Sequence, residues 1–232
     1  MPLKKVKVGS NMYQDWVTHT HSFLGGECPH KCVYCYVDNP RFGRAERYTG
    51  PIRLIEAEFK VNYGTGKTIF IEHMNDLFAK EVPAEFIARI FEHCHKWRDN
   101  TYVFQTKNPE RFMEGTFGVW PGKIILGTTV ETNRDIPNIS VAPAPKERIA
   151  ALAKLYSGTK KFITIEPVLD FDVDELAGMI AKANPFFVNL GADSKNHNLP
   201  EPTVEKVMAL VAKLAEYGIE LREKHNLQRL KP

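Results

Sequence analysis

Three of the chain's four cysteines, Cys28, Cys32 and Cys35, lie within eight residues in the spacing C-x3-C-x2-C. Thiolates are soft, polarisable anions that bind iron well, and a compact loop directs three of them at one metal cluster. A [4Fe–4S] cluster with three protein ligands keeps one iron open, whereas structural zinc sites and electron-transfer clusters usually have four. The spacing therefore predicts a loop that binds a [4Fe–4S] cluster with one iron free for an exogenous ligand.

Two other interpretations of these cysteines stay open. In the first, a further protein ligand such as His30 completes the set, and the chain is a non-catalytic iron–sulfur or zinc-binding module for electron transfer or structure. In the second, the metal is a zinc ion that acts as a Lewis acid in an enzyme. Zinc knuckles usually bring two separated ligand pairs, which this spacing does not resemble.

Composition and charge narrow the class of protein. A chain of 232 residues with 43% hydrophobic content can bury a large core. Its 31 basic and 28 acidic residues give a formal charge of +3, which does not compel a polyanionic partner. The basic start has no apolar run after it, and no stretch approaches the roughly 18 apolar residues of a membrane span. We expect one cytoplasmic domain over residues 1–232, with its core at about 17–225.

Short apolar runs typical of strands alternate with helical patterns along the chain. Pro83 suits the first turn of the first helix, Asp172 is expected to cap the third, and Gly218 to end the fourth. Cys94 lies on the apolar stripe of the first helix, where a buried cysteine is ordinary core material. We expect strands at Thr68–Glu72, Thr101–Gln105, Lys123–Thr129, Phe162–Glu166, Phe186–Leu190 and Ile219–Arg222, and helices at Pro83–Trp97, Lys146–Tyr156, Val173–Ala183 and Pro202–Tyr217.

Alternating strands and helices predict an α/β fold with right-handed crossovers and a parallel sheet. About six repeats favour a partial (βα)6 TIM-like barrel, since a complete eight-fold barrel typically needs about 250 residues. A doubly wound open sheet is the alternative.

Parallel-sheet enzymes carry their chemistry at the carboxyl ends of the strands. Polar residues follow each expected strand, and we expect them to lie around one mouth. They are Glu72, His73, Asn75, Asp76, Gln105, Thr106, Lys107, Thr129, Glu131, Glu166, Asn189 and Asp193.

The cysteine motif, with Tyr34 directly before its last cysteine, resembles the signature loop of the radical S-adenosylmethionine (SAM) superfamily. The wording CPHKCVYCY is similar to the spore photoproduct lyase branch. The later segments IFIEHMNDLF, VFQTKNPERF, IILGTTVETN and ITIEPVLDF resemble a short phage- and archaeal-type branch of unassigned function. The likeness covers roughly residues 20 to 225.

The resemblance implies an oxygen-sensitive enzyme with two cofactors, a [4Fe–4S] cluster and SAM. Cys28, Cys32 and Cys35 are then the cluster ligands, and SAM chelates the open iron. One electron from a low-potential donor of the flavodoxin or ferredoxin type cleaves SAM to methionine and a 5′-deoxyadenosyl radical, which abstracts hydrogen from the substrate. The substrate, and whether SAM is consumed, do not follow from the resemblance.

Further residues follow from the same resemblance as candidates for cofactor binding. Tyr34 is expected near the adenine or the cluster, with plain core packing as the alternative. Asn75 and Asp76 stand where many members place the carboxylate that receives the SAM ammonium, although the glycines of that segment are missing here. Lys107, beside Thr106, is expected to pair with the SAM carboxylate, or else to be a solvated surface lysine. Glu166 is expected to bind the ribose or substrate, or else to form an internal ion pair.

The segment after the cysteines interleaves arginines with aromatic residues, as in Arg41-Phe42-Gly-Arg44 and Arg47-Tyr48. Such a segment suits phosphate contacts and base stacking, or else ion pairs that cover the mouth. The leading expectation for the substrate is therefore a nucleobase, nucleotide or nucleic acid, with peptides and small metabolites as alternatives.

Overall fold

The computed structural model describes residues 3–7, 9–10, 13, 16–38, 46–195 and 197–231. Within this part of the chain, eight strands form one sheet in the order β1-β2-β5-β6-β7-β8-β9-β10. Strand β1 is antiparallel to β2, and every other pair in the sheet is parallel. A separate pair, β3 (Leu24–Gly25) and β4 (Arg53–Leu54), flanks the cysteine motif. The strands of the large sheet are β1 (Lys4–Lys5), β2 (His19–His21), β5 (Thr68–Ile71), β6 (Thr101–Thr106), β7 (Lys123–Thr129), β8 (Lys161–Ile165), β9 (Phe187–Leu190) and β10 (Glu220–Glu223).

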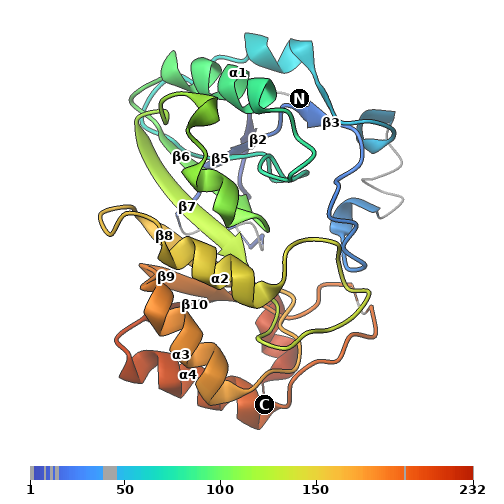
Figure 1. Cartoon of the computed structure of the whole chain (residues 1–232), viewed down its shortest axis with the longest axis vertical. Coiled ribbons are helices and arrows are strands. Elements are labelled where there is room, and N and C mark those ends of the chain that lie inside the picture. Colours follow the sequence, from blue (N-terminus) through green and yellow to red (C-terminus); the bar gives the residue numbers. More distant parts are fainter. Residues whose placement is uncertain are drawn as a thin grey trace.

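Four α-helices connect these strands in the described part of the chain. They are α1 (Ala84–His95), α2 (Pro145–Ala153), α3 (Val173–Ala183) and α4 (Val204–Glu216). Figure 1 shows them in sequence order from top to bottom beside the sheet, where α2 packs on α3 and α3 on α4. Short 3₁₀ helices at Pro109–Met113 and Gly115–Phe117, rather than an α-helix, connect β6 to β7.

The predicted α/β class and mostly parallel sheet are confirmed, and all six expected strands exist. Sequence reasoning missed β2, because its His-Thr-His sequence gives no apolar signal. The strands from β2 to β10 follow one another in chain order, unlike a doubly wound sheet, in which the order reverses at a switch point. The cysteine motif lies in the crossover between the first two parallel strands, β2 and β5.

The two faces of the sheet carry different cores because side chains alternate along each strand. On the helix side, Ile71, Phe104, Ile165 and Leu190 join the main core with the helices. On the inner side, Tyr13 packs with buried apolar side chains of four strands. These are Phe70, Val103, Phe162 and Phe187.

Gly127 allows the inner core to pack. A Cβ atom at this position would lie 2.3 Å from the Phe162 ring, so any larger residue would displace the ring. Closer to the carboxyl ends, the inner face becomes polar and presents Gln105, Thr129 and Thr164. The inner face therefore has an apolar base, and a polar layer lies above it.

All four expected helices exist, but α2 ends at Ala153 rather than Tyr156, and two of the expected end signals differ in detail. Pro83 is the residue before α1 rather than part of its first turn. Asp172 precedes α3, but its carboxylate accepts hydrogen bonds from Arg134 and not from the helix amides. Gly218 ends α4 with a φ of +69°, a left-handed conformation that glycine adopts freely. No helix in the described residues is long and apolar enough to cross a bilayer.

Candidate functional site

A pocket of about 430 Å³ lies at the carboxyl ends of the parallel strands. Its lining includes the three cysteines of the motif and all six of the other residues predicted to bind cofactor. Of the twelve polar residues expected at the mouth, ten line this pocket, whereas Glu131 and Asn189 lie outside its lining. The predicted residues in the lining are Cys28, Cys32, Cys35, Tyr34, Asn75, Asp76, Thr106, Lys107 and Glu166.

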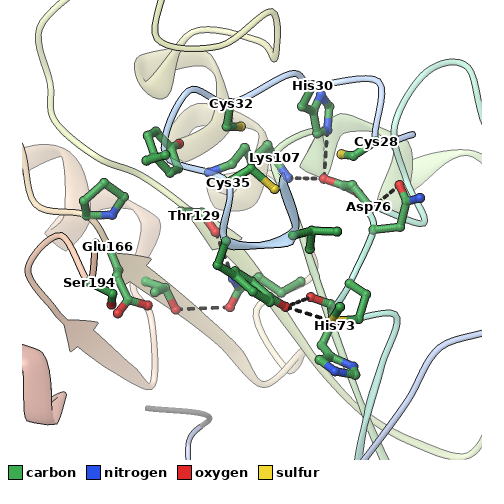
Figure 2. A pocket seen from close by; sticks show the side chains of 18 of the residues that line it. Cys28, His30, Cys32, Cys35, His73, Asp76, Lys107, Thr129, Glu166 and Ser194 are labelled. Carbon is green, nitrogen blue, oxygen red and sulfur yellow. Dashed lines mark hydrogen bonds and ion pairs between the residues drawn. The ribbon is translucent and has the colours of Figure 1, made fainter. Parts of the chain in front are cut away.

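We call residues 25–36 the cysteine loop. All four cysteines of the chain are thiols; Cys28 and Cys35 are half-buried, and Cys32 is buried. Figure 2 shows the three sulfur atoms of the loop on one side of the pocket, with Glu166 and Ser194 on another. Burial raises the pKa of the Cys28 thiol to about 12, and the charge of Asp76 is the second cause of this increase.

The donor set suits a thiolate-bound cluster, because three thiols of one short loop face one pocket. Among the described residues, no three His, Cys, Asp or Glu side chains are gathered closely enough to hold a metal ion. The role of the three cysteines as ligands therefore stays a prediction.

Asp76 braces the cysteine loop. Its Oδ2 lies 2.8 Å from His30 Nε2 and accepts the Lys107 amide, while its Oδ1 accepts the Thr106 hydroxyl and the Phe78 amide. Burial alone would raise the pKa of Asp76, but His30 and these donors lower it. Both oxygens of Asp76 are therefore used within the protein.

Asn75 also supports the cysteine loop, because its side-chain amide donates to the Gly26 carbonyl at 3.1 Å. Both residues that sequence reasoning placed at the SAM ammonium thus hold the loop in this structure. His30, the expected fourth ligand of a zinc site, has its Nε2 engaged with Asp76.

Glu131, at the end of β7, accepts hydrogen bonds from three parts of the chain. Tyr34 of the cysteine loop and the Lys107 ammonium both donate to Oε1, and the Arg148 guanidinium of α2 lies 2.9 Å from Oε2. Burial would raise the pKa of Glu131, but Lys107 and Arg148 lower it to about 2. Lys107, expected to pair with the SAM carboxylate, is thus paired with Glu131, and Tyr34 is bonded to the same carboxylate.

A second loop, residues 136–144, lies against the cysteine loop, and we call it the cover loop. The Val33 amide donates to the Ile139 carbonyl at 3.0 Å, and the Val141 amide donates to the His30 carbonyl at 2.9 Å. Ser140 Oγ lies 3.3 Å from Cys32 Sγ. Sequence reasoning missed this loop and Arg148, since neither follows a strand directly.

The side of the pocket that β8 to β10 line contains a half-buried ion pair between Glu166 and Lys224. Glu166 Oε2 accepts a hydrogen bond from Lys224 Nζ, and Glu166 Oε1 accepts one from the Asn226 amide at 2.7 Å. This is the internal ion pair that sequence reasoning kept as the alternative for Glu166. Ser194 and Lys195 are exposed at the rim of this side.

Glu72 has an unusual environment at the end of β5. Its Oε2 accepts the Phe23 and Leu24 amides at 2.8 and 3.1 Å, whereas its buried Oε1 meets no hydrogen-bond partner among the described residues. Burial raises the pKa of Glu72 to about 7. Its backbone is also left-handed, with a φ of +63°. Glu72 is therefore a buried carboxylate of the pocket lining, and one of its oxygens lacks a partner among the described residues.

The arginine-rich segment lies partly outside the described residues, including Arg41 and Arg44. In the described part, Arg47 is bonded to the buried Glu58 and to the Ser22 carbonyl, and Tyr48 is buried. These two side chains are therefore turned into the protein and are not available to stack on a base. Cys94 is completely buried in the main core, as predicted.

Three comparisons with known proteins extend this description. The sequence profile described as "Protein of unknown function (DUF5131)" matches residues 16–181. The comparison with curated proteins gave no match.

Among solved structures, the fold is similar to spore photoproduct lyase. A double mutant of that enzyme with bound AdoMet and dinucleoside spore photoproduct has a TM-score of 0.54 at 12% identity; the match covers 93% of this chain and 66% of the other. Two single mutants have TM-scores of 0.57 and 0.58, also at 12% identity. The chain thus spans just under two thirds of the length of these relatives, and the likeness establishes a shared α/β fold.

Proposed function

We propose that this chain, which belongs to the DUF5131 family of proteins of unknown function, is a radical SAM enzyme. One observation carries the proposal. The three cysteines of a C-x3-C-x2-C loop line a pocket at the carboxyl ends of a mostly parallel sheet, in a fold similar to spore photoproduct lyase. An open cluster in this pocket would lie beside the polar layer of the inner face, where a substrate has room to bind.

In the proposed enzyme, Cys28, Cys32 and Cys35 hold a [4Fe–4S] cluster, and the sheet forms a partial barrel. The bound cofactors supply the reductive cleavage of SAM and the hydrogen-abstracting radical, and a low-potential flavodoxin- or ferredoxin-type protein supplies the electron. The chain's own residues orient the cofactors and exclude water. Because Asp76 is saturated, we assign the SAM ammonium to the unpartnered oxygen of Glu72.

The test is anaerobic reconstitution of the purified chain with iron and sulfide, followed by dithionite and SAM. We expect about four irons per chain and formation of 5′-deoxyadenosine. Cys32→Ala should abolish both. Cys94→Ala is the matched control, since this thiol is buried in the main core and should leave both unchanged.

Other outcomes separate the alternatives. Stoichiometric zinc and no cluster under strictly anaerobic conditions would contradict the proposal and favour a zinc site. A brown cluster that neither binds nor cleaves SAM would favour an electron-transfer module.

For the substrate, we propose a molecule that contains a nucleobase. The support is the neighbouring lyase structure, described with a dinucleoside, and the presence of Tyr36 and Phe70 in the pocket lining. The test is binding of nucleosides, nucleotides, DNA and RNA at low salt, where phosphate contacts are strongest. Undetectable binding of all four by the SAM-loaded protein would contradict this substrate class.

A further inference from the structure

We infer that the cover loop supplies a hydrogen bond to the predicted cluster ligand Cys32, and that Ser140 thereby makes the cluster easier to reduce. This inference rests on the proposed function, and it assigns a role to a residue that lies outside the cysteine motif. Ser140 is a positioning and tuning residue rather than a catalytic one.

The contact joins residues 108 positions apart in the chain. Ser140 Oγ lies 3.3 Å from Cys32 Sγ, and Cys32 is only 8% exposed. The hydroxyl also donates to the His30 carbonyl at 3.0 Å and accepts the Ala142 amide at 3.0 Å. The oxygen therefore accepts from Ala142, and the single hydroxyl proton points toward the cysteine loop, where it is donated to the His30 carbonyl and where Cys32 Sγ is the other group in reach.

The protonation of Cys32 decides the direction of this hydrogen bond. As a thiol, Cys32 donates to Ser140. Metal ligands must be deprotonated, so a ligating Cys32 has no proton to give and becomes an acceptor. The Ser140 hydroxyl then turns its single proton from the His30 carbonyl to Cys32 Sγ, 3.3 Å away.

A donor at a cluster thiolate stabilises added negative charge and so favours the reduced form. Reduction adds one electron to the cluster, and dithionite supplies that electron in the test. The surrounding contacts hold the donor in place. Val33 and Val141 link the two loops through their amides, and Arg148 Nε donates to the Pro143 carbonyl at 2.5 Å.

The experiment is a redox titration of the reconstituted, SAM-free protein, followed by the electron paramagnetic resonance signal of the reduced cluster. Ser140→Ala is expected to load the same amount of iron and to shift the midpoint potential to a more negative value. At the wild-type midpoint, its ratio of reduced to oxidised cluster should fall several-fold, where a tenfold fall corresponds to 59 mV for one electron.

Two further variants make the result specific. Ser140→Thr keeps the hydroxyl and should keep the wild-type midpoint even if Ser140→Ala folds poorly. Ser157→Ala removes an exposed hydroxyl in the turn after α2 and should change nothing.

Each remaining outcome overturns a defined claim. An unchanged midpoint in Ser140→Ala with full iron content would overturn the tuning role alone. Loss of iron with an unchanged midpoint of the residual cluster would reduce Ser140 to a structural brace. Wild-type protein that takes up no iron would overturn the proposed function together with this role.

Discussion

The two sides of the pocket are constructed differently. On the cysteine side, Asp76 and Glu131 are buried, and each accepts hydrogen bonds from at least three groups of other elements. On the far side, Glu166 and Lys224 form a half-buried pair, and the partners of the Asp193 carboxylate, Lys195 and His197, come from its own loop. Ser194 and Lys195 are exposed at the rim.

Under the proposed function, we interpret this difference as a division of labour, with one side holding the cluster and the other side binding the substrate. A cluster requires ligands in fixed positions, and buried carboxylates with several charged donors hold the cysteine loop rigidly. A substrate site gains from a wall that adapts. We therefore expect substitutions on the cysteine side to cost much more stability than those on the far side, and four predictions follow in order of expected size.

Glu131→Ala should be the most damaging change. It leaves the buried Arg148 and Lys107 without their carboxylate, and removal of one partner of a buried ion pair typically costs about 3–5 kcal/mol. Denaturant unfolding of the unloaded protein measures this cost. Glu110→Ala removes an exposed pair with Lys154 and should cost less than about 1 kcal/mol. Equal losses of stability in Glu131→Ala and Glu110→Ala would show that the buried pairs of Glu131 stabilise the protein no more than an exposed pair does.

Glu72→Gln should change the pH dependence of stability. The pKa of Glu72 rises from 4.5 to about 7 through burial, so the wild type binds more protons folded than unfolded between these values. Its free energy of unfolding should therefore fall as pH rises from about 4.5 to about 7, by up to about 3 kcal/mol at 1.36 kcal/mol per pKa unit. Glu72→Gln should lack this contribution. If the free energies of unfolding of the wild type and Glu72→Gln changed in parallel with pH, the prediction would be refuted.

Glu166→Gln tests the far side. The amide keeps the shape of the side chain but gives up its charge-assisted bond with Lys224, so we expect a loss of about 1–2 kcal/mol. Glu223→Gln is the control, because its pair with Lys231 is more exposed. A loss as large as that of Glu131→Ala would show that both sides are equally rigid.

Lys195→Ala should have the smallest effect. The side chain is exposed at the rim, and the hydrogen bond from its backbone amide to Asp193 survives the substitution. Thermal unfolding should shift by no more than the equivalent of about 0.5 kcal/mol. A larger loss would mean that the rim is part of the folded core of the site.

Much of this architecture could be predicted from the sequence because buried parallel strands are apolar runs. TIFIE, TYVFQ and FITIE carry that signal directly, and polar residues at their ends locate the mouth. Strand β2 lacks the signal, since it is three residues long and begins and ends with histidine.

The partners of the site residues could not be predicted in the same way. Contacts such as Glu131 with Arg148 or Ser140 with Cys32 depend on how loops fold back across the mouth, and no local pattern encodes that geometry. For this reason Asp76 and Lys107 were placed correctly at the mouth, whereas the groups that they contact were not foreseen.

The N-terminal segment has a consequence for the order of events during synthesis. Tyr13 Oη lies 2.8 Å from the Thr164 hydroxyl, 151 residues later, and Trp16 packs against Phe187. Tyr13 and Trp16 leave the ribosome before β8 and β9, so they cannot reach their native positions until those strands have been made. The base of the pocket is completed only after β9 has been made, so the proposed cluster, if delivered earlier, would meet the cysteine loop before the pocket beneath it exists.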